Sequence, residues 1–311
     1  MDSLIFSLNA TIPVFLVMVV GYILKQRKMV NDEFVECSNK FNFMVCMPAL
    51  LIQDIMEVDI VSNFDGKYIA FCAFVTLFCI IVIWGVTKLC YHSSDRGEFV
   101  QGAYRGSAAI LGAALIENIY GNTGMAPLMI IGAVPLYNMF AVIVLTFEAD
   151  GGDNKKIKTA LIDVCKNPMI ISIFAGIIFS CLRIDFPQIV DNTIGMLARL
   201  VSPLALICIG AGFEGEKAIA RVRPTLVATF IKLIVQPVIF IPLAIYFGFT
   251  GDKLIALLIM LGAPSTASSY IMAKNMNHEG VLSSSIIVLT TILSSFTITA
   301  GLFILKYLGY V

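Results

Sequence analysis

Residues 262–276 read GAPSTASSYIMAKNM, and they interrupt an otherwise apolar segment that extends over residues 253–274. Pro264 has no backbone N–H and disfavours a helical turn before it. Gly262 and four short polar side chains surround it: Ser265, Thr266, Ser268 and Ser269. This pattern predicts a membrane helix broken at its centre, with free backbone groups that face a cavity. The alternative is a kinked, closely packed helix whose hydroxyl groups bond to its own backbone.

The composition of the chain indicates that these segments cross a membrane. Of the 311 residues, 59% are hydrophobic and only 14% are charged, whereas soluble domains carry about 25% charged residues. The apolar residues stand in blocks near the roughly 20 residues that a membrane helix needs, which is too long for barrel strands. Since backbone groups in lipid must be paired internally, the sequence predicts an all-α integral membrane protein.

Ten segments are long and apolar enough to be candidate transmembrane helices: 3–24, 35–56, 67–90, 98–120, 124–147, 167–184, 188–212, 219–248, 253–274 and 280–308. The longest polar break, 148–166, divides the chain into 1–147 and 167–311, with five segments in each half. The first segment is not a secretory signal peptide, because its start is MDSL, its apolar stretch is too long, and basic residues follow it.

The distribution of Lys and Arg predicts the orientation. One side would hold Lys25, Arg27, Lys28, Lys88, Arg96, Lys155, Lys156, Lys158, Lys166, Lys217, Arg221, Arg223 and Lys274. The other side would hold only Lys67, Arg183, Lys253 and Lys306. The basic side is expected to be cytoplasmic, which places the 148–166 linker inside and both termini outside. Five segments per half then make the second half an inverted repeat of the first.

Two pairs of segments support such a repeat. MVCMPALL at Met44–Leu51 corresponds to LVSPLALI at Leu200–Ile207, and each places a proline in the second segment of its half. GAYRGSAAILG at Gly102–Gly112 corresponds to GAPSTASSYIM at Gly262–Met272, in the fourth segment of each half. The fourth and ninth segments are therefore both expected to be broken crossover helices.

The fourth segment carries Arg105 beside Gly106 and Ser107, but no proline. An arginine within a membrane helix is costly and marks a transport pathway or a charge pair. Direct contact with an anion, snorkelling to the headgroups and structural pairing all remain open for Arg105. Asn138 in the fifth segment follows Pro135 and is placed to bridge to this break.

Other polar side chains within the segments have structural explanations. Arg199 and Lys232 would be fixed cations, interface anchors or salt-bridge partners, with a structural role favoured. Asn42 and Gln236 are typical of hydrogen bonds between helices. Asp54 and Glu117 are expected near outer ends, so that no carboxylate lies at the centre of the membrane; this disfavours a mechanism that needs a sodium or proton site there.

Several classes of function are disfavoured. The two histidines, His92 and His278, lie in expected loops, and the eight cysteines show no metal-binding spacing. Neither a nucleophile–base pair nor a carboxylate dyad is apparent, so we expect no enzyme, no cofactor and no metal site. A net charge of zero without a basic run argues against a nucleic-acid partner.

Six motifs in matching order resemble the auxin efflux carrier family of permeases, which is distantly similar to the plant PIN auxin carriers. They are FNFMVCMPALL (Phe41–Leu51), YRGSAAILG with ENIYG (Tyr104–Gly112, Glu117–Gly121), VPLYN (Val134–Asn138), NPMIISIFAGIIFS (Asn167–Ser180), SPLALICIGAGF (Ser202–Phe213) and GAPSTASSYIMAKNM (Gly262–Met276). The family often has Asn where this chain has Ser107, and a proline where it has Ala113 or Ala114.

The resemblance implies a ten-helix fold like that of bile-acid and sodium–proton transporters. The fourth and ninth helices cross at unwound centres in that fold. Helices 1, 2, 6 and 7 form a scaffold that often dimerises, and helices 3–5 and 8–10 form a transport domain that moves by an elevator-like step.

The expected function is secondary transport of a small mono- or dicarboxylate, such as malate, malonate or an auxin-like acid, across the plasma membrane. The residues expected to bind it are Arg105, Gly106, Ser107, Asn138, Pro264, Ser265, Thr266, Ser268 and Ser269. Proton coupling, sodium coupling and uniport stay open. The alternative is a membrane receptor or regulatory protein that binds a ligand on the same fold without moving it.

Overall fold

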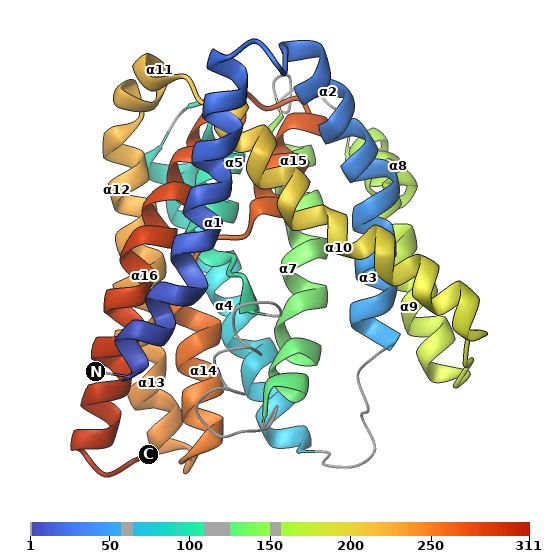
Figure 1. The fold of residues 1–311 in the computed structure, drawn as a ribbon. Helices are drawn as coiled ribbons and strands as arrows, with labels where there is room; N and C mark the ends of the chain where they lie inside the picture. Colours follow the sequence, from blue (N-terminus) through green and yellow to red (C-terminus); the bar gives the residue numbers. More distant parts are fainter. Residues whose placement is uncertain (1, 57–64, 92, 109–124, 150–156) are drawn as a thin grey trace.

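The computed structural model describes residues 2–56, 65–91, 93–108, 125–149 and 157–311, and these form a bundle of helices without a β-strand (Figure 1). The first half contains α1 (Asp2–Gln26), α2 (Asp32–Phe41), the π-helical turn η1 (Asn42–Cys46), α3 (Met47–Met56), α4 (Gly66–Cys90), α5 (Arg96–Tyr104) and α7 (Ala126–Glu148). The all-α prediction is confirmed for the described residues.

The second half begins with α8 (Ile157–Lys166), which forms the end of the predicted polar linker. It continues with α9 (Pro168–Cys181), α10 (Gln188–Ala211), α11 (Gly215–Ala220), α12 (Val222–Phe230), the π-helical turn η4 (Ile231–Val235), α13 (Gln236–Tyr246), α14 (Asp252–Gly262), α15 (Ala267–Asn275) and α16 (Val281–Tyr307).

By length and hydropathy alone, five helices of the described residues could cross a membrane, or six if the bent pair α14–α15 is one span. The five are 66–90, 126–148, 188–211, 222–246 and 281–307. Thr11–Gln26 and Pro168–Cys181 are shorter apolar helices. Residues 109–124, with most of the fourth predicted span, the ENIYG motif and Glu117, lie outside the described residues.

Side-chain caps fix where several helices begin. Asn31 accepts a bond from Phe34 N (2.8 Å), Asp65 from Tyr68 N (3.1 Å) and Asn167 from Met169 N (2.9 Å). Pro168 then occupies the first turn of α9, where its missing N–H costs nothing. Each of these helices therefore begins at a polar residue, because the capping side chain satisfies a backbone N–H of the first turn that has no partner within the helix.

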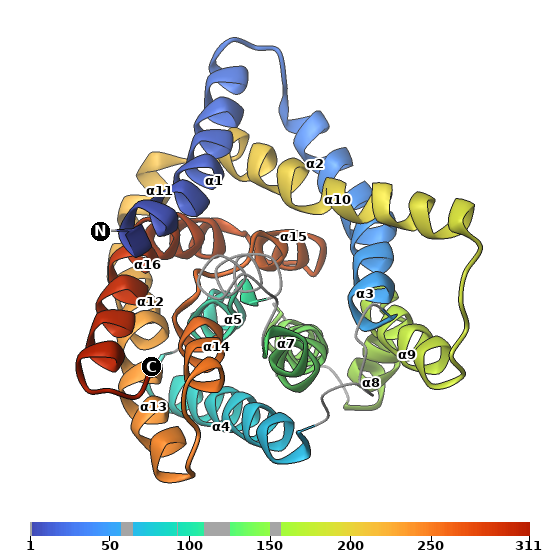
Figure 2. The same ribbon diagram turned by 60° about the horizontal axis from the view of Figure 1, so that its bottom comes forward.

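α1, α3, α9 and α10 pack in one layer along the outside of the bundle (Figure 2). Glycines let α1 and α10 approach with backbone against backbone, since a Cβ built on Gly210 would lie 1.8 Å from Met18 O. A Cβ on Gly21 would lie 2.2 Å from Ile207 O. In the same view α5, α7, α14 and α15 lie inside the bundle, with α4, α13 and α16 around them.

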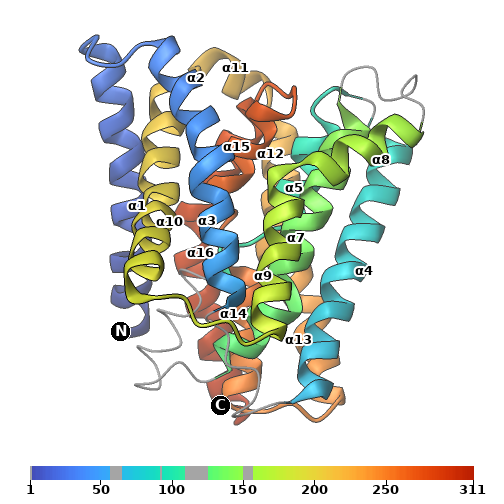
Figure 3. The ribbon, with the colours of Figure 1, turned by 90° about the vertical axis from the view of Figure 1, so that its right-hand side faces the viewer.

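The N-terminal helix begins, and the C-terminal helix ends, at the same end of the molecule (Figure 3). Lys25 and Lys88 are in the last turns of α1 and α4, at the opposite end. There Arg96 donates to Glu148 Oε2 (2.8 Å), and Trp84 Nε1 donates to Glu148 Oε1 (2.6 Å). α5 enters the bundle from this basic end, and α14 enters it from the opposite end (Figure 1).

Candidate functional site

The fourth predicted segment is broken within the bundle. α5 ends at Tyr104, Arg105 has extended backbone angles (φ −80°, ψ 134°), and residues 105–107 are not helical. The backbone at Gly106 lies close to two neighbouring groups, because a Cβ there would be 2.8 Å from Lys232 Nζ and 3.2 Å from Met260 O. The break therefore forms without a proline, at a residue that has no side chain to separate it from its neighbours.

The ninth predicted segment is broken at the proline. α14 ends at Gly262, residues 263–266 are not helical, and α15 starts at Ala267 with a bend of 41° between the two helices. Ser265 N is satisfied by Thr290 Oγ1 of α16 (3.0 Å). Thr266 precedes the first turn of α15, and its hydroxyl bonds to Ser268 Oγ (3.0 Å).

The two breaks meet. Ser107 N donates to Pro264 O (2.8 Å), so that a hydrogen bond joins the two non-helical backbone segments. We name this place, residues 105–107 and 263–266, the crossing. Its backbone groups are the kind that can face a ligand within a membrane protein, because they are buried in protein rather than in lipid.

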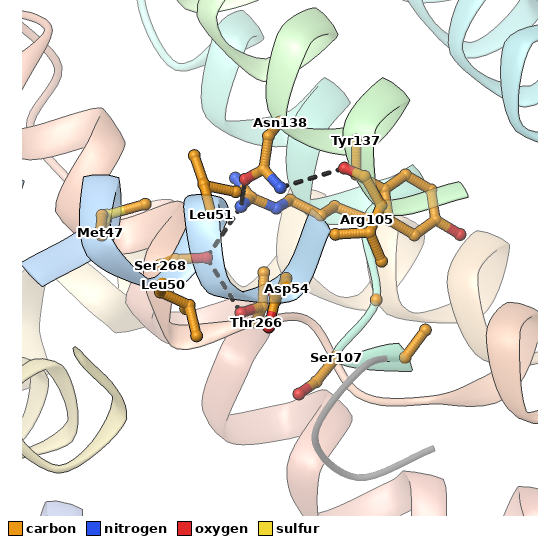
Figure 4. Close-up of a pocket in the computed structure, with 13 residues that line it drawn as sticks. Met47, Leu50, Leu51, Asp54, Arg105, Ser107, Tyr137, Asn138, Thr266 and Ser268 are labelled. Atoms are coloured by element: carbon orange, nitrogen blue, oxygen red, sulfur yellow. Dashed lines mark hydrogen bonds between the residues drawn. The ribbon is translucent and has the colours of Figure 1, made fainter. Parts of the chain in front are cut away.

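Arg105 points from the crossing into the bundle and is only 3% exposed. Its Nη2 donates to Asn138 Oδ1 of α7 and to Ser268 Oγ of α15 (2.8 Å) (Figure 4). Its Nη1 lies 2.9 Å from Met272 Sδ. The guanidinium is thus held by neighbouring helices and does not extend back toward the start of α5 at the basic end. The ion pairs formed among the described residues do not include Arg105.

A pocket adjoins the crossing and contains six of the nine predicted site residues: Arg105, Gly106, Ser107, Asn138, Thr266 and Ser268. The other three do not line it. Pro264 supplies the carbonyl that joins the two breaks, Ser269 Oγ donates to Thr266 O (2.6 Å), and the Ser265 hydroxyl is buried without a partner among the described residues.

The other pocket residues were not among those predicted from the sequence. Met47, Leu50, Leu51 and Asp54 come from α3, and Tyr137 comes from α7 (Figure 4). Val134 of α7 and Ala108, which follows the crossing residue Ser107, complete the lining. The four α3 residues have the spacing i, i+3, i+4 and i+7, so they share one helix face. That spacing is visible in the sequence, but without the partner helices it does not tell which face lines a pocket. Asp54 lies two residues before the end of α3, as expected, and also lines the pocket.

The remaining polar residues of the predicted spans have different surroundings. Asn42 Nδ2 donates to Val201 O of α10 (2.9 Å), and Gln236 Nε2 donates to Ala103 O of α5 (2.6 Å). Arg199 is exposed on α10, away from the pocket, whereas Lys232 is fully buried beside the crossing. In the described part of the chain, no three His, Cys, Asp or Glu side chains come together as metal ligands would.

The chemistry of the pocket suits an anion. The pocket contains the Arg105 guanidinium, the hydroxyl groups of Ser107, Thr266 and Ser268, and the N-terminus of α15 with its partial positive charge. From α3, Met47, Leu50 and Leu51 provide an apolar wall, and the pocket also contains the carboxyl group of Asp54. Such a site could hold a carboxylate that carries a short apolar body.

Comparison with known proteins identifies similarity to membrane transport proteins. A family model described as "Membrane transport protein" matches residues 6–301. The chain is 22% identical to the "Uncharacterized transporter YfdV" of Escherichia coli (strain K12), over 97% of this chain and 98% of that protein. It is also 22% identical to the "Putative malonate transporter" of Rhizobium meliloti (strain 1021), over 95% of this chain and 94% of that protein.

Proposed function

The chain belongs to the membrane transport protein family, and we propose that it is a secondary transporter that moves a small organic anion across the plasma membrane. The expected substrates are mono- or dicarboxylates such as malate, malonate or an auxin-like acid. The relative whose name refers to malonate supports this substrate class.

The observation that carries the proposal is the buried Arg105 guanidinium beside the N-terminus of α15. One of its contacts is to the thioether of Met272, which is a weak acceptor. A substrate carboxylate would be a far better acceptor for these N–H groups, since charge-assisted bonds are about twice as strong as neutral ones. Arg105 would therefore bind the carboxylate, while Asn138 and Ser268 hold the guanidinium in place.

The pocket is small in the conformation of the structure. Its cavity volume is about 50 Å³, below the range of about 300–1,000 Å³ found for small-molecule sites, so the walls would have to move apart to admit even a small substrate. The wall that α3 contributes would contact the carbon skeleton of the substrate. Ser107 and Thr266 would contribute hydrogen bonds from the crossing.

The mechanism that we propose is elevator-type alternating access in a ten-helix, 5+5 inverted repeat. The layer of α1, α3, α9 and α10 would be the scaffold and the surface of a homodimer, with the remaining spans as the transport domain. The position of the pocket between α3 and the crossing supports this assignment, because relative movement of the two parts would carry the site across the membrane.

The test is thermal unfolding of the purified protein with malonate, malate and indole-3-acetate, with malonamide as the neutral analogue of malonate. A ligand that binds only the folded state raises the melting temperature by mass action. We expect at least one carboxylate to stabilise the protein, and malonamide to have no effect. Stabilisation by malonamide equal to that by malonate would contradict an anion site.

Two arginine variants make the test specific. Arg105→Ala removes the buried cation and should lower carboxylate affinity at least tenfold, which corresponds to about 1.4 kcal/mol. Arg199→Ala removes an exposed arginine from α10 and should bind like the wild type. Equal affinities in the two variants would refute the role of Arg105.

A further inference from the structure

Lys232 lies in the π-helical turn η4 and is fully buried. Its Nζ is 3.1 Å from Met260 O and 3.4 Å from Tyr104 O. Burial of an ammonium group is costly unless it is paired or hydrogen-bonded. Among the described residues the ion pairs do not include Lys232, so these carbonyls are its known polar partners.

The two carbonyls need a donor because both half-helices end there. In a continuous helix Met260 O would accept from the N–H of residue 264, but that residue is Pro264 and has no N–H. Tyr104 is the last residue of α5. Because the backbone is extended from Arg105 onward, the N–H groups that would bond to Tyr104 O in a continuous helix point elsewhere. The amine of Lys232 takes the place of both missing donors.

Gln236 lies about one turn after Lys232 in the chain, and its side chain caps the C-terminal end of α5. Its Nε2 donates to Ala103 O (2.6 Å), the carbonyl that precedes Tyr104 O. Residues 232 and 236 have the i, i+4 spacing and so share one helix face. This face is therefore built to receive the C-terminal ends of α5 and α14.

The positive charge of Lys232 also matches the partial negative charges of the two helix ends beside it. A helix C-terminus carries the equivalent of about half a negative charge, so two such ends present about one negative charge together. In carriers with broken helices, half-helix C-termini and unwound carbonyls are where coupling cations bind. Gly106 leaves the space for the amine, because a Cβ on this residue would lie 2.8 Å from Lys232 Nζ.

We propose that Lys232 is a tethered cation that neutralises the C-termini of α5 and α14 and positions the crossing, in the place where a carrier of this type would otherwise bind an inorganic cation. This inference rests on the proposed function, because it concerns the same crossing. The positive charge then belongs to the protein in every step of transport, so a sodium gradient does not drive this carrier.

The first experiment uses the wild-type protein. Its melting temperature, and its affinity for the carboxylate that stabilises it, are measured in sodium chloride and in choline chloride at equal ionic strength. We expect the two affinities to agree within twofold and the melting temperatures to coincide. A tenfold tighter binding in sodium would overturn the proposal.

The second experiment removes the cation. Lys232→Ala should melt at a lower temperature than the wild type in choline, and ethylammonium should restore part of the loss by filling the space of the missing amine. Lys274→Ala, which removes an exposed lysine from the last turn of α15, is the matched control and should not respond to ethylammonium. A purely structural role would leave Lys232→Ala equally unstable in choline and ethylammonium, and that result would contradict the proposal.

These readouts separate the two hypotheses. Rescue of ligand-free Lys232→Ala by ethylammonium, together with no stabilisation of the wild type by any carboxylate, would refute the proposed substrate class but not the tethered cation. If Lys232→Ala gives no folded protein, the sodium comparison in the wild type still decides, because it needs no variant.

Discussion

Arg105 and Gly106 are adjacent in the sequence and serve opposite faces of the crossing. The side chain of Arg105 reaches Asn138 and Ser268, whereas the missing side chain of Gly106 makes room for Lys232. The sequence predicts that Asn138 bridges to this break, and the structure places it there. The partners of Lys232 were not predictable, because they are backbone carbonyls of helix ends whose position depends on the whole fold.

A substitution at Gly106 tests this packing at the residue scale. In Gly106→Ala the new methyl group would meet Lys232 Nζ at 2.8 Å and Met260 O at 3.2 Å. We expect a loss of about 1–3 kcal/mol in the free energy of unfolding, as for other overpacked sites. The matched control is Gly262→Ala at the other break, where the Cβ has its nearest contact at 3.5 Å and should be tolerated. Thermal unfolding in detergent measures both, and an equal effect of the two substitutions would contradict the account.

At the scale of the elements, the helices could be predicted better than the site. Hydropathy placed most helix ends within a few residues, since the apolar blocks and the capping residues that flank them are local signals. The break at Pro264 is also a local signal. The face of α3 that lines the pocket is not, because Met47, Leu50, Leu51 and Asp54 gain a role only from α5, α7 and α15 opposite them.

The contact between α1 and α10 depends on glycine. In Gly210→Ala the Cβ would lie 1.8 Å from Met18 O, and a backbone atom cannot yield as a flexible side chain can. We expect this change to cost about 3 kcal/mol or more. Gly85→Ala on α4 has no atom within 4 Å of its Cβ and should be neutral or slightly stabilising. A melting temperature of Gly210→Ala equal to that of Gly85→Ala would refute the close contact.

An ion pair joins the start of α4 to the start of α14 and predicts a pH dependence. Lys253 Nζ donates to Asp65 Oδ2, and this bond lowers the pKa of the Asp65 carboxyl below its ordinary value. Because the folded-state pKa is the lower one, the stabilisation is present above the unfolded pKa of about 4 and is lost as the pH falls through the folded value. Asp65→Asn should therefore melt below the wild type at neutral pH, and the difference should shrink as the pH falls below about 4. A difference that is constant with pH would contradict the ion pair.

At the scale of the whole molecule, the family match confirms the resemblance to auxin efflux carriers that the six motifs indicate. These motifs could be read from the sequence because glycine, proline and small polar residues stand out in apolar helices. The number of spans and their repeat symmetry stay predictions, since they depend on residues 109–124 as well as on the described helices.

Two exposed cysteines test the predicted orientation. Cys181 ends α9 at the end of the molecule that carries the termini, and Cys90 ends α4 at the basic end (Figure 3). With all other cysteines replaced by serine, a membrane-impermeant maleimide should label Cys181 in intact cells. It should label Cys90 only after permeabilisation. The reverse pattern would place the termini in the cytoplasm.

The most direct test of the central claim is counterflow in proteoliposomes. Vesicles preloaded with unlabelled malonate, malate or indole-3-acetate are placed in a trace of the same labelled acid, and its accumulation is followed for the wild type, Arg105→Ala and Arg199→Ala. We predict that at least one acid accumulates with the wild type and with Arg199→Ala, and that Arg105→Ala is at least tenfold slower. A carboxylate that stabilises the wild type but shows no counterflow would contradict a carrier and indicate a receptor instead.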